Sequence, residues 1–162
     1  MAAEARVQPG SGRTRDEPAG GPARFVARVE ARPLAVRMLL YALLKRFEKH
    51  IGPSDAGSVE LVLAEILNNI VEHAYGEESI GEVEVVADML PETLVCNVQD
   101  WGRSLPGLAI PEGALPSCGA GIETLPEGGW GWALIRTVAS DLDYRRDAGC
   151  NRLRVAIPIS FE

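Results

Sequence analysis

The sequence has few of the residues that define several common classes of protein. It contains three cysteines and two histidines among 162 residues. Cys96, Cys118 and Cys150 are odd in number and widely spaced, so they suggest neither a disulfide framework nor a Cys-x-x-Cys metal site. We expect them to be reduced and to serve mainly in packing. The two histidines, His50 and His73, leave too few nitrogen and sulfur ligands in local register for a zinc site.

An excess of positive charge is also absent. Sixteen Lys and Arg residues stand against 23 Asp and Glu residues, which gives a net charge of -7 and a pI of about 4.9. This balance argues against a nucleic-acid-binding surface and against a polybasic contact with a membrane. A protein partner or a small ligand is the better expectation.

Long apolar segments are missing as well. No run of 18 or more apolar residues is present, so the sequence predicts no transmembrane helix. Residues 1–21 contain Arg, Asp, Glu, Pro and Gly where a signal peptide needs an apolar core. We therefore expect a cytoplasmic protein. No internal repeat is found.

The composition changes near residue 22. Residues 1–22 are rich in Gly, Pro, Ala and Arg and contain almost no large hydrophobic residues, so they cannot bury enough surface to offset the entropy lost on ordering. They predict a flexible tail. Residues 23–162 predict one domain, because nearly half of the sequence is apolar and its length is typical of a single domain.

Hydrophobic periodicity predicts the order of the elements in this domain. Alternation over residues 23–31 indicates a strand, and helical spacing indicates one helix at 33–49 and a second that ends near residue 75. The later segments are strands at 81–89 and 93–98, a long Gly- and Pro-rich loop at 103–128, a helix at 131–140, and strands at 142–146 and 152–159.

These elements predict an α+β fold, a two-layer sandwich with helices packed on one face of a mixed, mostly antiparallel sheet. Ser54, Asp55 or Ser58 is expected to cap the second helix at its N-terminus. A loop as long as 103–128 in a compact domain is usually functional or disordered.

The second predicted helix carries polar residues inside a strongly apolar segment. Glu65, Asn69 and His73 follow one another at intervals of four residues, so they lie in a line along the helix. The paired Asn68 and Asn69 are poor helix formers, which suggests a role beyond local propensity. A solvated polar face with ordinary i,i+4 hydrogen bonds is an equally good interpretation of this helix alone. The face that should be buried consists of Val59, Leu63, Ile66, Ile70 and Ala74.

Two further segments bear on that choice. Asp100-Trp101-Gly102 follows the predicted strand at 93–98, and Gly128-Gly129-Trp130-Gly131-Trp132 opens the last predicted helix. The glycine segment is not a P-loop, and it is a poor dinucleotide fingerprint because Leu134 stands where the third glycine belongs.

In this order and spacing, the three segments resemble the nucleotide-binding boxes of the Bergerat-fold ATPases, the superfamily of histidine kinases, gyrase-type ATPases and Hsp90. More closely, the sequence resembles the anti-sigma-factor serine/threonine kinases, whose members bind a sigma factor and phosphorylate its antagonist. The resemblance runs from about Ala23 to Phe161. Its most specific part is Glu-x-x-x-Asn-x-x-x-His-Ala-Tyr, from Glu65 to Tyr75.

The resemblance implies a protein serine/threonine kinase that uses ATP and Mg2+. Its implied partners are a sigma factor and an antagonist with a phosphorylatable Ser or Thr, and it allows a homodimer. Two other classes stay open. One is a non-catalytic, ATP-dependent anti-sigma or switch-protein binding module, and the other is a detached histidine-kinase catalytic domain. The absence of a His-bearing helical hairpin before the first segment favours the serine kinase.

The resemblance also implies roles for residues of the second helix. Asn69 provides an amide oxygen, a hard ligand suited to Mg2+, and the matching Asn holds the metal in the family. Glu65 stands where the family places the base that takes the proton of the substrate hydroxyl. His73 matches a family position and is expected to pack or to form hydrogen bonds. The alternatives are an intrahelical hydrogen bond for Asn69 and a solvated carboxylate for Glu65.

Asp100 and Gly102 are expected at the adenine base. A carboxylate there can accept the exocyclic amino proton of adenine, and a glycine lets the ring approach the backbone. A simple Asp-x-Gly turn is the alternative, and spacing alone would favour it. Trp101 departs from the small or polar residue that the family has between them.

Gly129, Gly131 and Trp132 are expected near the phosphates, because the start of a helix presents free N–H groups and a positive dipole end. A glycine turn before a core helix is the alternative. Trp132 stands where the family usually has Leu. Gly149-Cys150-Asn151 replaces the usual Gly-Thr or Gly-Ser, so Asn151 is the candidate substitute for the lost hydroxyl. Residues 103–127 correspond to a loop that folds over the phosphates and are expected to become ordered with Mg2+-ATP.

Overall fold

The computed structural model describes residues 23–76, 80–113 and 130–160 of the chain. In chain order its elements are β1 (Arg24–Glu30), α1 (Pro33–Phe47), α2 (Pro53–Asn69), the π-helix η1 (Ile70–Tyr75), β2 (Glu82–Leu90), β3 (Thr93–Asp100), the short 3-10 helix η2 (Pro106–Leu108), α3 (Trp130–Val138), β4 (Asp141–Asp147) and β5 (Cys150–Pro158). The predicted tail, Gly129 and most of the predicted phosphate loop lie outside the described residues.

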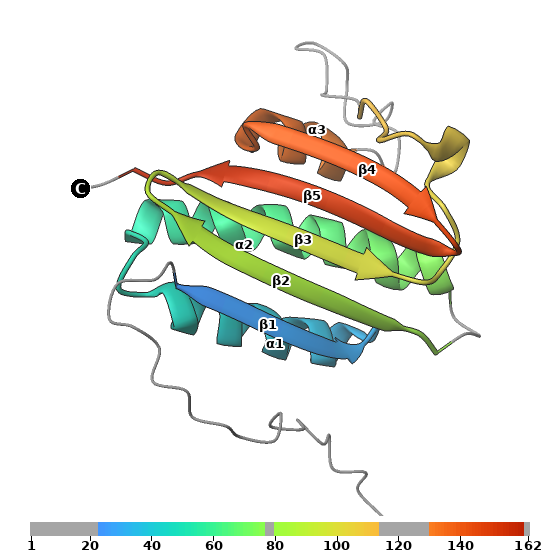
Figure 1. Cartoon of the computed structure of the whole chain (residues 1–162), viewed down its shortest axis with the longest axis horizontal. Helices are drawn as coiled ribbons and strands as arrows, with labels where there is room; N and C mark the ends of the chain where they lie inside the picture. The colour runs from blue at the N-terminus through green and yellow to red at the C-terminus, as the bar shows by residue number, and fades with distance from the viewer. Residues whose placement is uncertain (1–22, 77–79, 114–129, 161–162) are drawn as a thin grey trace, which may run out of the picture.

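The strands form one sheet in the order β1-β2-β3-β5-β4. Helices α1, α2 and α3 lie together on one of its faces (Figure 1). The predicted α+β sandwich of two layers is therefore confirmed. Each pairing among the described strands is antiparallel, so the parallel component that a mixed sheet would need is absent from this part of the chain.

The core lies between the helices and the sheet. Helix α2 contributes Val59, Leu63 and Ile66, each at most 1% exposed, and this confirms the predicted apolar face. Along β2 the buried positions alternate, as expected for a sheet with one covered face, whereas β3 has three consecutive buried residues, Leu94, Val95 and Cys96, before it alternates. Because α2 packs against both α1 and α3, its C-terminal end is held at the centre of the helical layer.

The start of α2 differs from the prediction. Its N-cap is Gly52, and neither Ser54, Asp55 nor Ser58 caps it with a side chain. The carboxylate of Asp55 accepts a hydrogen bond from the backbone N–H of Ser160 instead, at 2.7 Å. Pro53 begins the helix, where its missing N–H and fixed φ cost nothing. The Asp55 side chain thus makes a tertiary hydrogen bond and not the helix cap that the local sequence predicts.

The end of this helix also differs. The sequence predicts one α-helix as far as Tyr75, whereas residues Ile70–Tyr75 form a π-helix. The hydroxyl of Tyr75 donates to the Glu82 carbonyl at 2.7 Å and accepts from the Trp101 N–H at 2.8 Å. Its ring lies against Gly81, where a Cβ would be 1.9 Å from a ring carbon. Tyr75 thus fastens the π-helical turn to β2 and β3, and single π turns are frequent at functional sites.

None of the helices in the described ranges is long and apolar enough to cross a membrane. Cys96 and Cys150 are free and buried. Burial raises the pKa of the Cys96 thiol to about 12, which makes it an inert packing residue. Cys118 lies outside the described residues.

Candidate functional site

A pocket of about 440 Å3 opens where η1 meets the end of β3 and the start of β5. Its lining includes Asn69 and His73, Asp100, Trp132, and Asn151. The sequence predicts all five as site residues, although they come from five different elements. The volume lies within the range of about 300–1000 Å3 that is usual for small-molecule sites.

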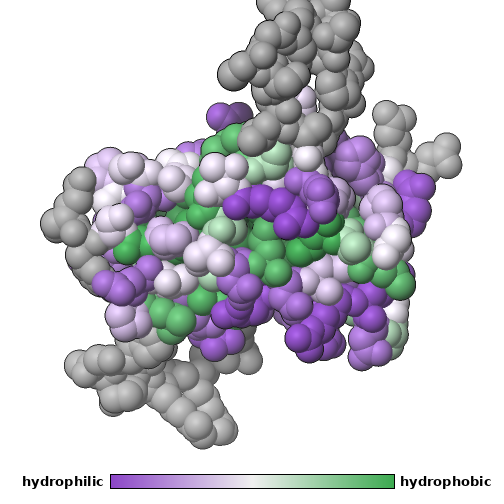
Figure 2. All heavy atoms as spheres, turned by 90° about the horizontal axis from the view of Figure 1, so that it is seen from above, coloured by the Kyte–Doolittle hydropathy of each residue, from purple (hydrophilic) through white to green (hydrophobic). Residues whose placement is uncertain are grey.

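Both polar and apolar groups line this pocket. Ile66, Ile70, Leu105 and Leu153 provide an apolar wall. Seen from the side of β4 and α3, hydrophobic side chains form a band between hydrophilic ones (Figure 2). An apolar wall with a few polar groups suits a flat base that carries hydrogen-bonding edges.

Asp100 ends β3 and is 5% exposed. Its Oδ1 accepts hydrogen bonds from the Gly102 N–H at 2.9 Å and from Asn151 Nδ2 at 2.8 Å. Burial raises the pKa of Asp100, while the two hydrogen bonds and the nearby Arg146 cation oppose that rise. Within the described residues no donor reaches Oδ2. This oxygen is therefore available to accept a hydrogen bond from a ligand.

Asn151 lines the pocket beside Asp100 and is only 4% exposed. Its Nδ2 donates to Asp100 Oδ1 and to the Arg103 carbonyl at 2.9 Å, and its Oδ1 accepts from Tyr144 and Arg146. Sequence reasoning missed Tyr144 and Arg146. The only available signal was that both lie on a strand beside the one that carries Asn151.

Asn69 is the last residue of α2, and its amide lines the pocket. Its Nδ2 is buried and has no hydrogen-bond partner in the described part of the chain. A buried amide nitrogen without a partner costs about 1–3 kcal/mol, so a ligand acceptor at this position would be stabilising. The Asn69 amide fits the expected Mg2+ and phosphates, because its nitrogen can donate to a phosphate oxygen and its oxygen is a ligand that Mg2+ accepts.

Metal ligands other than this amide are scarce. Across residues 23–76, 80–113 and 130–160, no group of three or more His, Cys, Asp and Glu side chains could hold a metal ion. A Mg2+ ion at Asn69 would take its remaining ligands from phosphate oxygens and water, which is the usual arrangement for this ion.

Glu65 lies one turn before Asn69 and is outside the described lining of the pocket. It is half-buried against the first turn of α3, where a Cβ on Gly131 would be 2.3 Å from Glu65 Oε2. A side chain at position 131 would make the carboxylate end of Glu65 shift. The first turn of a helix has free N–H groups and a positive dipole end, which attract a carboxylate or a phosphate. Glu65 is thus next to the predicted phosphate site.

Gly102 is needed for packing beside the pocket, and His73 lies at the rim of the pocket. A Cβ on Gly102 would be 2.5 Å from the Ala74 carbonyl oxygen, so glycine is needed here for the contact between β3 and η1. Gly102 acts on the pocket through its hydrogen bond to Asp100. His73 is at the rim with a side chain that is 75% exposed, and its Nε2 is 3.8 Å from Glu72 Oε2. His73 thus lies at the rim of the pocket, and its packing or hydrogen-bonding role stays a prediction.

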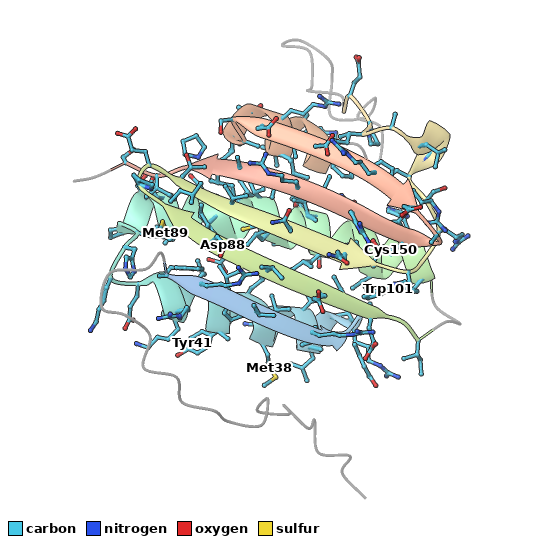
Figure 3. The ribbon with its side chains drawn as sticks, viewed as in Figure 1. Met38, Tyr41, Asp88, Met89, Trp101 and Cys150 are labelled. Carbon is cyan, nitrogen blue, oxygen red and sulfur yellow. The ribbon has the colours of Figure 1, made fainter. Side chains whose placement is uncertain are left out.

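The large side chain of Trp101 is next to Asp100 in the sequence but lies outside the described lining of the pocket. It follows Asp100 at the same end of the sheet as Cys150 (Figure 3). The Arg28 guanidinium lies 4.6 Å from the centre of its ring. The indole is therefore stacked on a β1 side chain, and it is not part of the described pocket lining.

Known proteins are similar to this chain in sequence and in fold. The family model described as histidine kinase-like ATPase domain matches residues 25–157. Proteins named serine-protein kinase RsbW from Bacillus mycoides (strain KBAB4) and Bacillus cereus (strain G9842) are 31% and 30% identical to the chain over 96 residues. Each match covers 59% of this chain, and the chain spans 59% of the length of these relatives.

A solved structure gives the same fold. It contains the RsbU and RsbW domains of Rv1364c from Mycobacterium tuberculosis and superposes with a TM-score of 0.60. The superposition covers 86% of this chain and 33% of that one at 18% sequence identity. The likeness therefore concerns the fold alone.

Proposed function

Because the chain belongs to the histidine kinase-like ATPase domain family, we propose that it is a Mg2+-dependent protein serine/threonine kinase. Its proposed role is to bind a sigma factor and to phosphorylate the antagonist of that factor with ATP. The observation that carries this proposal is that one pocket presents the carboxylate of the buried Asp100 and the amide nitrogen of Asn69, which has no hydrogen-bond partner among the described residues. The similarity to proteins named serine-protein kinase RsbW supports the choice of acceptor residue.

The proposed orientation of ATP follows from these two groups. Asp100 Oδ2 accepts the amino proton of adenine, and the apolar wall that includes Ile66 and Leu153 contacts the ring. The phosphates extend toward Asn69 and the first turn of α3. When bound, Mg2+ would neutralise charge on the phosphates, and Asn69 is the residue that would hold it.

Glu65 is the proposed general base. Its carboxylate takes the proton of a Ser or Thr hydroxyl on the antagonist while the hydroxyl oxygen attacks the γ-phosphorus and ADP leaves. The position of Glu65 against Gly131 supports this role, because the carboxylate lies beside the helix end where the phosphates are expected. A general base must be close to the transferred group, so this placement favours catalysis over a purely solvated carboxylate.

Helix α1 provides a candidate surface for a protein partner. Leu34, Met38 and Tyr41 are 70%, 54% and 72% exposed, and they share one side of the helix. Figure 3 shows Met38 and Tyr41 on its outer side. Residues 33–47 include three cationic and no acidic side chains, although the whole chain has a net charge of -7. An apolar stripe among cations fits an acidic, partly apolar surface of a partner.

The direct test is phosphate transfer. The purified protein is incubated with γ-labelled ATP and Mg2+ and with sigma factor and antagonist pairs from the same genome. We expect label on a Ser or Thr of one antagonist and a stable complex with its sigma factor. Absence of label on every antagonist would contradict the kinase proposal.

A nucleotide-dependent binding module is the second candidate. It is favoured by one observation, which is that Glu65 is not among the described residues lining the pocket. Such a module would bind ATP and a partner and would transfer no phosphate. The transfer assay therefore separates the two candidates.

A further inference from the structure

We propose that Asn151 is a positioning residue, which together with Tyr144 and Arg146 holds Asp100 as the acceptor for the nucleotide base. This inference rests on the proposed nucleotide binding and assigns work to three residues that the kinase proposal does not use. Asn151 is 4% exposed at the start of β5, and Tyr144 and Arg146 come from β4. Their side chains converge on one amide.

The amide of Asn151 can adopt only one orientation. Tyr144 Oη donates to Asn151 Oδ1 at 2.8 Å, and Arg146 Nη1 donates to the same oxygen at 2.6 Å. A flipped amide would present N–H groups to both donors. The nitrogen must therefore face Asp100, to which it donates at 2.8 Å. Because Asn151 Nδ2 also donates to the Arg103 carbonyl at 2.9 Å, the amide has no hydrogen-bonding capacity left for a ligand.

The same side chains fix the segment that follows β3. Arg146 Nη1 donates to the Gly102 carbonyl at 2.9 Å, and the Leu105 N–H donates to Tyr144 Oη at 3.1 Å. Residues 103–105 belong to the described lining of the pocket. Asn151, Tyr144 and Arg146 thus hold the carboxylate and the adjacent wall in place before any ligand binds. Such preorganisation improves affinity by lowering the cost of ordering on binding.

The arrangement leaves Asp100 with a single vacant acceptor. Oδ1 is occupied by two donors, and Oδ2 is free of donors from the described residues. An ionised carboxylate accepts only, so this oxygen selects a ligand edge that carries an amino group. A protonated carboxyl would present an O–H in part of the population and would oppose the same amino group.

Ionisation of Asp100 depends on the groups around it. Arg146 and Tyr144 face it from β4, Arg103 lies after β3, and Tyr75 and His73 belong to η1. The Asn151 hydrogen bond lowers the pKa of Asp100 against the effect of burial. Removing that hydrogen bond should raise the pKa, so nucleotide binding should be lost at a higher pH as the solution is acidified.

The test is calorimetric titration with ADP across a range of pH, using full-length wild type, Asn151→Ala and Tyr144→Phe. We expect about tenfold weaker binding by Asn151→Ala at neutral pH, equivalent to one net hydrogen bond of about 1.4 kcal/mol. The pH below which binding is lost should also move upward. Tyr144→Phe removes one hydroxyl and keeps the ring, so it tests the same network if Asn151→Ala does not fold.

Arg152→Gln is the matched control, because this exposed neighbour of Asn151 contacts neither Asp100 nor the pocket. It should bind ADP as wild type does at every pH. Wild-type affinity and an unchanged pH profile in folded Asn151→Ala, or in Tyr144→Phe where Asn151→Ala does not fold, would overturn the positioning role alone. Failure of wild type to bind any adenine nucleotide would overturn the proposed function and this inference together.

Discussion

Replacing Asp100 by Asn changes one side-chain atom at the proposed binding site for the adenine ring. Two donors, the Gly102 N–H and Asn151 Nδ2, face the position of Oδ1 at 2.9 and 2.8 Å. The oxygen of the new amide must occupy that position, because its nitrogen would meet both donors. The amide nitrogen of Asp100→Asn is therefore directed to the place of Oδ2, where it opposes the amino group of adenine.

The expected magnitude follows from this exchange of acceptor for donor. A hydrogen bond to a charged group contributes about 1.5–3 kcal/mol, and the loss of that amount weakens binding roughly 10- to 150-fold. Calorimetry with ADP measures the change directly. The hydrogen bonds to Gly102 and Asn151 are kept, so the variant should fold. Wild-type ADP affinity in a folded Asp100→Asn protein would refute the assignment of Asp100 to the base.

The stability of the same variant should depend on pH. Burial raises the pKa of Asp100 in the folded protein, so ionisation of this group costs stability as pH rises through its folded pKa. The amide cannot ionise and escapes that cost. We expect Asp100→Asn to gain stability relative to wild type above that pKa and to lose the advantage below the unfolded pKa. Thermal unfolding at several pH values measures this, and an advantage confined to acid would contradict the sign.

Three further substitutions test other parts of the site. Gly102→Ala places a Cβ 2.5 Å from the Ala74 carbonyl and should lower the free energy of unfolding by about 1–3 kcal/mol, which urea denaturation would detect. Gly131→Ala places a Cβ 2.3 Å from Glu65 Oε2, so phosphate transfer should fall while ADP affinity stays within about threefold, and unchanged transfer would argue against Glu65 as base. Tyr41→Asp should weaken partner binding in a pull-down and leave ADP binding intact, whereas undiminished partner capture would exclude the α1 surface.

Much of the fold could be predicted because its sequence patterns are strong. The alternation at β1 and β2 and the helical spacing of Val59, Leu63 and Ile66 gave the elements to within a few residues. Asn69 and Asp100 were predicted from the order of three segments, and Asn151 from its place where the family has Gly-Thr or Gly-Ser; all three line the pocket. Order along the chain carries this information because the fold brings the end of α2, the end of β3 and the start of α3 to one pocket.

The features that escaped prediction depend on contacts between distant segments. The π-helical turn at residues 70–75 is held by Tyr75 contacts with β2 and β3, which helical periodicity does not report. Asp55 does not cap α2 as expected, because its carboxylate accepts a hydrogen bond from the backbone N–H of Ser160. Tyr144 and Arg146 have no motif of their own, and their role emerges only when β4 pairs with β5 and brings them to Asn151.

Glu65 is the residue proposed to make this histidine kinase-like ATPase domain a protein kinase. Glu65→Gln keeps the size of the side chain and removes its ability to accept a proton. The most direct measurement is the rate of labelled phosphate transfer to a Ser or Thr of the antagonist by wild type and Glu65→Gln, with ATP affinity measured in parallel. We expect Glu65→Gln to transfer phosphate about 100- to 10,000-fold more slowly, with nearly unchanged ATP affinity. Equal rates for the two proteins, or no transfer by wild type, would rule out Glu65 as the base of a kinase.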